Sequence, residues 1–249
     1  MSAALAGLNI LVTRPEHQAN HLCQLLKEQG AHPLSFPLID IKPLDTLTAP
    51  SLSHYDVIIF VSNNAVQLAS PFIKPIMATA KIAAVGKATA YLLQEQGYHV
   101  DILPEEQFDT EGLLAHPQLQ SVQQQAILIV RGQGGRPVLG DVLQQRGANV
   151  EYLAAYQRCL PKINKQNVLQ DALQKNALDI ILISSSEALQ NLLLLTDTAQ
   201  HDKLRDIQLA VTHPRQAEKA KTLGFTKKMI ISPQPGDTPL INALLKWQG

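Results

Sequence analysis

The amino-acid sequence nearly repeats itself, and this internal repeat restricts the fold more than any other feature. NILVTRP and a helical pattern that stops at Gly30 are matched by AILIVRG and a helical pattern that stops at Gly147. Two further pairs of segments match in the same order, 55–69 with 178–192 and 81–97 with 207–224. Two copies of one series of strand–helix units predict two domains of similar topology.

Short apolar runs alternate with helical patterns along the whole chain. Runs this rich in isoleucine, leucine and valine are typical of strands buried on both faces of a parallel sheet. The alternation predicts an α/β protein with two doubly wound parallel-sheet domains, in which helices cover both faces of each sheet. A short helix from 63 to about 70 and strands at 98–103 and 228–232 belong to this prediction.

The domain boundaries follow from prolines rather than from the repeat alone. Residues 33–43 hold three prolines, which suit an extended connecting strand at a sheet edge. We therefore expect the chain to cross over after its first strand and helix and to return later, instead of dividing near residue 120. The expected domains are 1–36 with 162–249 and 42–155, and strands 37–41 and 156–161 form a two-stranded connection.

Composition excludes several classes of function. The 249 residues carry 21 Lys and Arg against 21 Asp and Glu, so no strong global field attracts nucleic acid or an anionic membrane. Cys23 and Cys159 form no CxxC motif and are expected to be free thiols in a reducing compartment. No convincing signal peptide or membrane span is present. These features predict a cytoplasmic protein, which we expect to be a monomer.

A glycine-rich turn, RGQGGR at 131–136, follows one predicted strand and precedes a helix that Pro137 begins. Glycines permit close approach of a ligand, and the start of a helix offers unpaired N–H groups, so this turn suits an anion. The dinucleotide motif fits only in part, because Pro137 stands at the place of its third glycine. Glu151 has about the right spacing for a ribose acid but begins its strand. A tight turn with two solvated arginines is the simpler alternative.

Parallel strands bring all their following turns to one edge of a sheet, and we expect the turns of both domains to face one cleft. Serine and threonine in such turns often only cap helices. His17 and His21 are spaced to share a metal ion, but no third ligand is apparent, so no metal is expected. The candidate substrate-binding residues in these turns are Thr13, Arg14, Ser62, Asn63, Gly86, Thr89, Arg131, Gly132, Gly134, Arg136, Ser184, Ser185, Thr212 and Arg215.

The sequence resembles the uroporphyrinogen-III synthase family over nearly its whole length. The resemblance is carried by the repeat and by VTRP at 12–15, RGxGGR at 131–136, GDxLxxRGAxV at 140–150 and AYQR at 155–158. It implies two α/β domains joined by two extended connections. It also implies cyclisation of hydroxymethylbilane, a linear tetrapyrrole, with inversion of the last pyrrole ring and without a cofactor.

The resemblance assigns family positions to Ser62, Thr89, Ser185 and Tyr156, whereas residues 211–217 depart from the family pattern. Catalysis then consists mostly of holding a flexible chain in one reactive geometry. The phenol of Tyr156 is a neutral hydrogen-bond donor that could assist the leaving hydroxyl or hold a pyrrole. The alternative for Tyr156 is a strand residue that bridges the two domains.

Two other classes of function fit the same pattern. A two-domain small-molecule sensor would bind a tetrapyrrole without changing it. A nucleotide-dependent α/β enzyme would use the turn at Gly132, and nucleotides would then raise its melting temperature.

Overall fold

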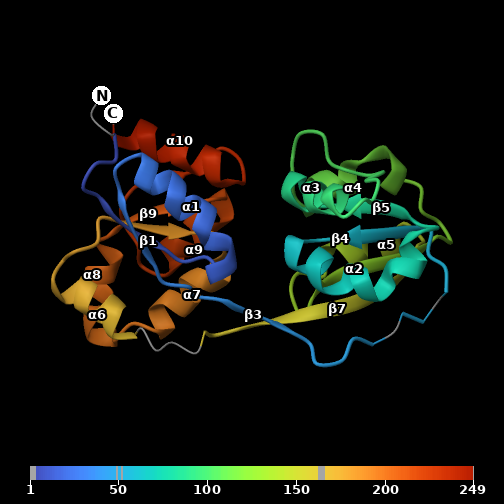
Figure 1. Ribbon diagram of the computed structural model, residues 1–249, viewed down its shortest axis with the longest axis horizontal. Helices are drawn as coiled ribbons and strands as arrows, with labels where there is room; N and C mark the ends of the chain where they lie inside the picture. Colours follow the sequence, from blue (N-terminus) through green and yellow to red (C-terminus); the bar gives the residue numbers. More distant parts are fainter. Residues whose placement is uncertain (1–3, 49, 52, 162–165, 249) are drawn as a thin grey trace. The chain divides into compact units, whose positions relative to one another are not determined.

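The computed structural model describes residues 4–48, 50–51, 53–161 and 166–248, apart from the side chains of His17, Gln166 and Asn167. The chain divides into two compact units, Met1–Asp40 with Cys159–Gly249 and Ile41–Arg158 (Figure 1). The predicted α/β class with two parallel sheets is confirmed. Compared with the expected boundaries, residues 37–40 and 159–161 lie in the first unit, and residues 41 and 156–158 lie in the second.

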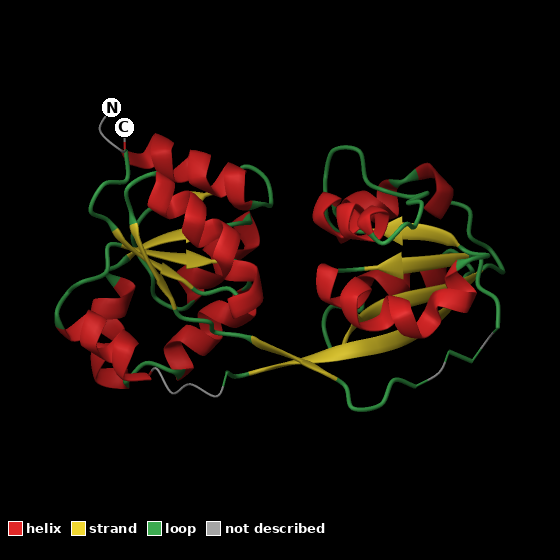
Figure 2. Cartoon of the chain, viewed as in Figure 1, coloured by secondary structure: helices red, strands yellow, loops and turns green. Residues whose placement is uncertain are grey.

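The first unit is a five-stranded sheet between helices (Figure 2). Its strand order is β10 (Ile230–Ile231), β9 (Gln208–Val211), β8 (Ile180–Ile183), β1 (Asn9–Val12) and β2 (His32–Ser35), and the described pairs are parallel. Its helices are α1 (Glu16–Glu28), α6 (Gln166–Gln174), α7 (Ser186–Leu194), η2 (Thr198–Gln200), α8 (His201–Arg205), α9 (Pro214–Thr222) and α10 (Asp237–Gln248). Helices α1 and α10 share one core cluster with β1 and β8, while α7 and α9 contact each other.

The second unit repeats this arrangement. Its strand order is β3 (Asp40–Pro43), β7 (Asn149–Cys159), β6 (Ala126–Gly132), β4 (Val57–Phe60) and β5 (Lys81–Ala84). Its helices are α2 (Asn63–Met77), α3 (Lys87–Glu95), α4 (Thr110–Ala115), η1 (Pro117–Leu119) and α5 (Val138–Gln145). One face of the sheet packs on α2 and α3 and the other on α4 and α5, so each face has its own buried cluster.

A matched pair of aspartates shows that the sequence repeat is also a structural repeat. Asp56 and Asp179 stand just before β4 and β8, at corresponding places in the two units. The carboxylate of Asp56 accepts the backbone N–H of Ala126 at 2.8 Å, and that of Asp179 accepts the N–H of Asn9 at 2.8 Å. Each aspartate thus continues the strand ladder by one bond at the amino end of the sheet.

Three predicted elements differ from the structure. Helix α2 does not end near Ser70 but continues through Pro71 and Pro75 to Met77. An interior proline costs about 3 kcal/mol in an isolated helix, and here burial of Ile73 and Met77 in the core offsets that cost. The strand expected at 98–103 is a single bridge from Ile102 to Ala83, and beside it the side chain of Asp101, not a backbone carbonyl, accepts the N–H of Ile82 at 2.8 Å. The strand expected at 228–232 shortens to the two residues of β10.

Among the described residues, no helix is long and apolar enough to cross a membrane. Cys23 and Cys159 are both free thiols. Burial raises the pKa of the Cys23 thiol above its ordinary value, which keeps this thiol in its unreactive protonated form.

Candidate active site at the carboxyl ends of the second sheet

The carboxyl ends of β4, β5 and β6 bring three predicted turns side by side. Phe60 at the end of β4 pairs with Ala84 of β5 and with Val130 of β6. The turns that follow these strands therefore begin at the same level of the sheet. This places Ser62, Asn63, Gly86, Thr89, Arg131, Gly132, Gly134 and Arg136 along one edge of the second unit.

Ser62 and Tyr156 form a pair of hydroxyl groups at this edge. Ser62 is the N-cap of α2, and its Oγ accepts the backbone N–H of Ala65 at 3.2 Å. The same Oγ lies 3.0 Å from the phenolic oxygen of Tyr156. The serine and the tyrosine that the family resemblance selects are therefore in direct contact.

A β-bulge directs the Tyr156 side chain. The register of β7 against β6 shifts so that Arg131 pairs with Ala154 but Gly132 pairs with Tyr156, which leaves Ala155 as an extra residue. Because of this shift, Ala155 and Tyr156 are consecutive residues that both belong to the core cluster of α2 and α3. The ring lies against Gly132, where a Cβ atom would come within 2.5 Å of a ring carbon. The Tyr156 side chain is only 1% exposed and is part of the core of the second unit.

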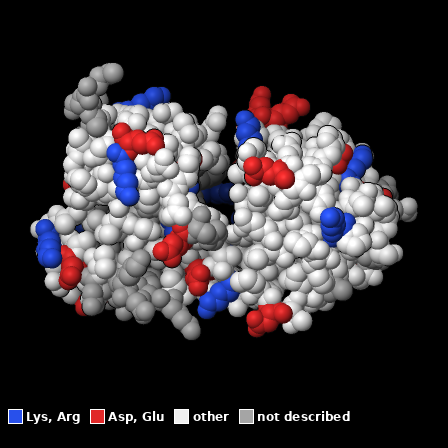
Figure 3. All heavy atoms as spheres, viewed as in Figure 1, with Lys and Arg blue, Asp and Glu red and all other residues white. Residues whose placement is uncertain are grey.

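A pocket of about 220 Å³ lies beside this tyrosine. The residues of the glycine-rich turn line it, together with Thr110, Leu139, Tyr156, Arg158 and others. Acidic and basic side chains are interspersed over the face drawn in Figure 3, in keeping with zero formal charge. A formal charge of zero means that an anion site on this protein would depend on local groups.

Arg131, a predicted substrate-binding residue, lines this pocket and braces its own turn. Its guanidinium donates to the carbonyl oxygens of Gly132 and Arg136, each at 3.3 Å, and to that of Gly134. Gly134 and Gly135 have φ of 74° and 91°, in the left-handed region that favours glycine. A Cβ atom on Gly135 would overlap with Nη2 of Arg131. These two glycines therefore serve the shape of the turn and its arginine.

Arg136 is the more available cation of this turn. It forms an ion pair with Glu111 of α4 at 2.7 Å, and this hydrogen bond lowers the pKa of the Glu111 carboxyl. The two side chains are 51% and 41% exposed, so the pair is weak.

Thr89 links two neighbouring turns. It is the third residue of α3 and is almost fully buried, and its hydroxyl donates to the side-chain oxygen of Asn63 at 3.1 Å. Gly86 is the N-cap of this helix. Sequence reasoning missed Lys87, whose ammonium lies 4.4 Å from the centre of the Phe108 ring. The sequence could have pointed to Lys87, because a lysine in the first turn of a helix is disfavoured by the helix dipole.

The predicted residues Thr13 and Arg14 of the first unit have partners within that unit. The hydroxyl of Thr13 is buried and donates to the carbonyl of Leu182 at 2.6 Å. Arg14 forms an ion pair with Asp237, whose carboxylate also lies 2.6 Å from Nδ1 of His21. His21 thus has a carboxylate partner, and the side chain of His17 lies outside the described residues. The described side chains contain no group of three or more His, Cys, Asp and Glu that could hold a metal ion.

In the first unit, Gln216 takes the position that Thr89 has in the second. It is the third residue of α9, and its side-chain oxygen accepts the N–H of Thr212 at 2.9 Å. Its amide nitrogen donates to the carbonyl of Ser184 at 2.9 Å. Ser185 caps α7 by accepting the N–H of Ala188 at 3.0 Å. Where residues 211–217 depart from the family pattern, a glutamine therefore links the two turns. Nearby, His213 is the N-cap of α9, and its side chain accepts the backbone N–H of Arg215 at 3.1 Å.

Glu151, the acidic residue that a nucleotide-binding alternative would need for the ribose, already has hydrogen-bond partners. Glu151 accepts the hydroxyl of the buried Tyr55 at 2.6 Å and the backbone N–H of Ser51 at 2.8 Å. It lies near the start of β7, at the opposite end of the sheet from the glycine-rich turn. Glu151 therefore fastens the segment before β4 to β7 and does not face the turn.

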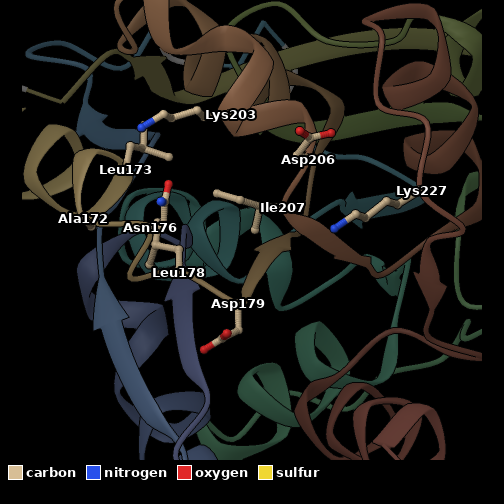
Figure 4. A pocket seen from close by; sticks show the side chains of 9 residues that line it. All are labelled: Ala172, Leu173, Asn176, Leu178, Asp179, Lys203, Asp206, Ile207 and Lys227. Atoms are coloured by element: carbon tan, nitrogen blue, oxygen red, sulfur yellow. The ribbon is translucent and has the colours of Figure 1, made fainter.

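A second pocket, of about 310 Å³, lies at the amino ends of β8 and β9 in the first unit (Figure 4). Its polar side chains do not converge on one point, since Lys203 and Asp179 point in different directions. The carboxylate of Asp179 already accepts the N–H of Asn9. The pocket beside Tyr156 is therefore the better candidate for chemistry.

Comparison with known proteins agrees with the motifs. The chain matches the family described as uroporphyrinogen-III synthase HemD over residues 20–242. Uroporphyrinogen-III synthase of Escherichia coli (strain K12) is 30% identical over 232 residues, which cover 88% of this chain and 92% of that protein. The enzyme of Salmonella typhimurium is 31% identical over 232 residues, with 88% of this chain and 92% of that protein covered.

Solved structures show the same fold. A crystal structure of uroporphyrinogen-III synthetase from Helicobacter pylori 26695 has a TM-score of 0.64 at 16% identity, covering 96% of this chain and 99% of that one. A mutant uroporphyrinogen III synthase from the extremely thermophilic bacterium Thermus thermophilus has a TM-score of 0.63 at 18% identity, with coverage of 96% and 99%. Because the family pattern spans most of its length, this chain belongs to the uroporphyrinogen-III synthase family.

Proposed function

We propose that this protein cyclises hydroxymethylbilane to uroporphyrinogen III, with inversion of the last pyrrole ring, in tetrapyrrole biosynthesis. Family membership over most of the chain supports the reaction. The observation that carries the choice of site is the contact of Ser62 and Tyr156 beside the glycine-rich turn. The proposed catalytic residue is Tyr156.

The reaction needs a group that assists departure of the hydroxyl. The carbon–oxygen bond of the hydroxymethyl group breaks, and the hydroxide takes up a proton to leave as water. A pyrrole carbon forms the closing bond to the freed methylene carbon, and the pyrrole loses a proton in exchange. For inversion, one bond between the last ring and its bridging carbon also breaks and forms again at the other end of that ring. An electron-rich pyrrole expels hydroxide readily, so a hydrogen bond to the leaving oxygen is sufficient assistance. Tyr156 is a neutral donor for that bond.

The remaining task is to hold one folded conformation of the substrate. Its pyrroles carry carboxylates, which suit the N–H groups at the starts of α2, α3 and α5 and the guanidinium of Arg136. Lys87 adds a cation at the start of α3. The turns of the first unit at Ser184, Ser185, Thr212 and Arg215 are proposed to bind further carboxylates, whereas Thr13, Arg14 and Arg131 support the turns.

We propose that the protein acts in the cytoplasm as a monomer, without a cofactor and without binding nucleic acid or membrane. The formal charge is zero, and acidic and basic side chains are interspersed on the face drawn in Figure 3. Both observations argue against nucleic acid as a partner. Sedimentation at working concentration measures the mass, and a dimer would contradict the monomer.

Incubation with hydroxymethylbilane tests this function. The products are oxidised to porphyrins and separated into isomers, with heat-denatured protein as the control. We expect mostly the inverted type III isomer, whereas the control gives the uninverted type I isomer, because the substrate also closes unaided. Binding of the substrate with the control ratio of isomers would support a sensor instead.

A further inference from the structure

The two hydroxyl groups of Ser62 and Tyr156 contain more donors than their described partners use. A hydroxyl has one hydrogen to donate and two lone pairs to accept. Oγ of Ser62 accepts the N–H of Ala65, and the 3.0 Å contact between the two oxygens uses one of the two hydroxyl hydrogens. Neither hydroxyl has another partner among the described residues, so one hydrogen remains for a ligand.

The capping bond favours one of the two arrangements. Ser62 is fixed as an N-cap, in which its oxygen already accepts a bond from the helix backbone. If Ser62 donates to the Tyr156 oxygen, the hydrogen bonds run in one direction, from the Ala65 N–H through the Ser62 hydroxyl to the phenol, so that each bond polarises the next and the phenolic hydrogen is left over. In the reverse arrangement Ser62 would accept twice, and its own hydrogen would have to reach the ligand.

The backbone fixes the other side of the ring. The bulge at Ala155 turns Tyr156 toward Ser62, and the absence of a side chain at Gly132 makes room for the ring. The ring therefore has little freedom to rotate, and the direction of its O–H bond is the remaining variable. A partner that donates to the phenolic oxygen sets that direction.

From this geometry we infer that Ser62 is a positioning residue, which donates its hydrogen to the Tyr156 oxygen and so points the phenolic hydrogen into the pocket beside the glycine-rich turn. The inference rests on the proposed function, because the pocket is where the leaving hydroxyl of the substrate would lie. Ser62 then acts through Tyr156 and not by binding the substrate itself.

A double-mutant cycle on the full-length protein tests this role. Formation of the type III isomer from hydroxymethylbilane is measured for wild type, Ser62→Ala, Tyr156→Phe and the double variant. We expect kcat to fall about 100-fold in Tyr156→Phe and about tenfold in Ser62→Ala, with KM nearly unchanged in both. The double variant should be no slower than Tyr156→Phe, because Ser62 has nothing left to position.

Two further variants separate positioning from helix capping. Ser62→Thr keeps both the cap and the donor, so its kcat should return to near the wild-type value. Ser185→Ala removes the equivalent cap from α7 and measures, by melting temperature alone, what loss of a cap costs. If Ser62→Ala fails to fold, Ser62→Gly removes the hydroxyl with a smaller capping loss and takes its place in the cycle.

Several results would overturn the inference. Multiplicative effects in the cycle, a larger fall in kcat for Ser62→Ala than for Tyr156→Phe, or a raised KM with unchanged kcat would each contradict it. Wild-type kcat in Tyr156→Phe would remove the role of the phenol, while type III formation by the wild-type protein would still support the proposed reaction. Absence of type III product from the wild-type protein would overturn both.

Discussion

Arg131 illustrates at the scale of one residue why a motif does not reveal the role of each member. The sequence places an arginine and three glycines where an anion could bind. The structure uses that arginine to bond the carbonyl oxygens of its own turn. Satisfying several carbonyls with one guanidinium orders a segment that has little side-chain packing. Arg136, whose ion pair with Glu111 is exposed, is then the cation of the turn that is not bonded to the turn's own carbonyls.

A pair of glycine substitutions tests this brace. Gly134 and Gly135 both have positive φ, so alanine is strained at either position, by about 1 kcal/mol. Only at Gly135 would the added Cβ meet Arg131. We expect Gly135→Ala to lower the free energy of unfolding in urea more than Gly134→Ala, by about another 1 kcal/mol. In an Arg131→Ala background the difference should vanish, and equal losses in the wild-type background would contradict the brace.

At the scale of elements, Glu151 ties β7 to the segment that precedes β4. Partial burial on its own raises the pKa of the Glu151 carboxyl, but hydrogen bonds from Ser51 and Tyr55 outweigh it, and the pKa is lowered. A carboxyl with a lowered pKa in the folded state stabilises the fold above its unfolded pKa. That contribution is lost as the pH falls through the folded pKa.

This linkage gives a prediction for stability against pH. Glu151→Gln should reduce the free energy of unfolding at neutral pH. It should also make stability fall less steeply as the pH drops below about 4.5, the ordinary value for glutamate. Urea unfolding at several pH values measures both effects. Parallel curves for the variant and the wild type would show that the carboxylate contributes nothing as a charge.

The elements that the sequence predicts well are those in which local pattern and burial agree. β4 and β8 are entirely buried, and their apolar runs are unmistakable. The predicted end of α2 is wrong because its prolines are a local signal, whereas burial of Ile73 and Met77 depends on the rest of the fold. The same limit applies to Tyr156, since no local pattern marks the bulge that places it against Gly132 and Ser62.

At the scale of the whole molecule, the two units have separate cores. The clusters around Phe60 and around Ile129 consist only of residues from the second unit, and the cluster around Ile10 only of residues from the first. The repeat and the prolines of the sequence are enough to propose that the chain leaves the first unit, builds the second and returns. They carry none about which turn residues bond one another, because such bonds depend on strand register.

Separate cores predict that the second unit folds alone. A fragment of residues 41–158 contains both of its buried clusters and all of strands β4 to β6. We expect it to be monomeric, with a cooperative thermal transition and protected amides in β4 and β6. A fragment of residues 1–120 would split both units and should remain unfolded. A cooperative fold in 1–120 and none in 41–158 would contradict the division.

The most direct test of the central claim is the rate and isomer ratio of product formed by Tyr156→Phe. The substitution keeps the ring that packs against Gly132 and deletes only the hydroxyl that contacts Ser62. We expect slow formation of the type III isomer, a larger share of type I at long times, and a melting temperature close to that of the wild type. Wild-type rate and isomer ratio in this variant would contradict the claim that the Tyr156 hydroxyl takes part in the reaction.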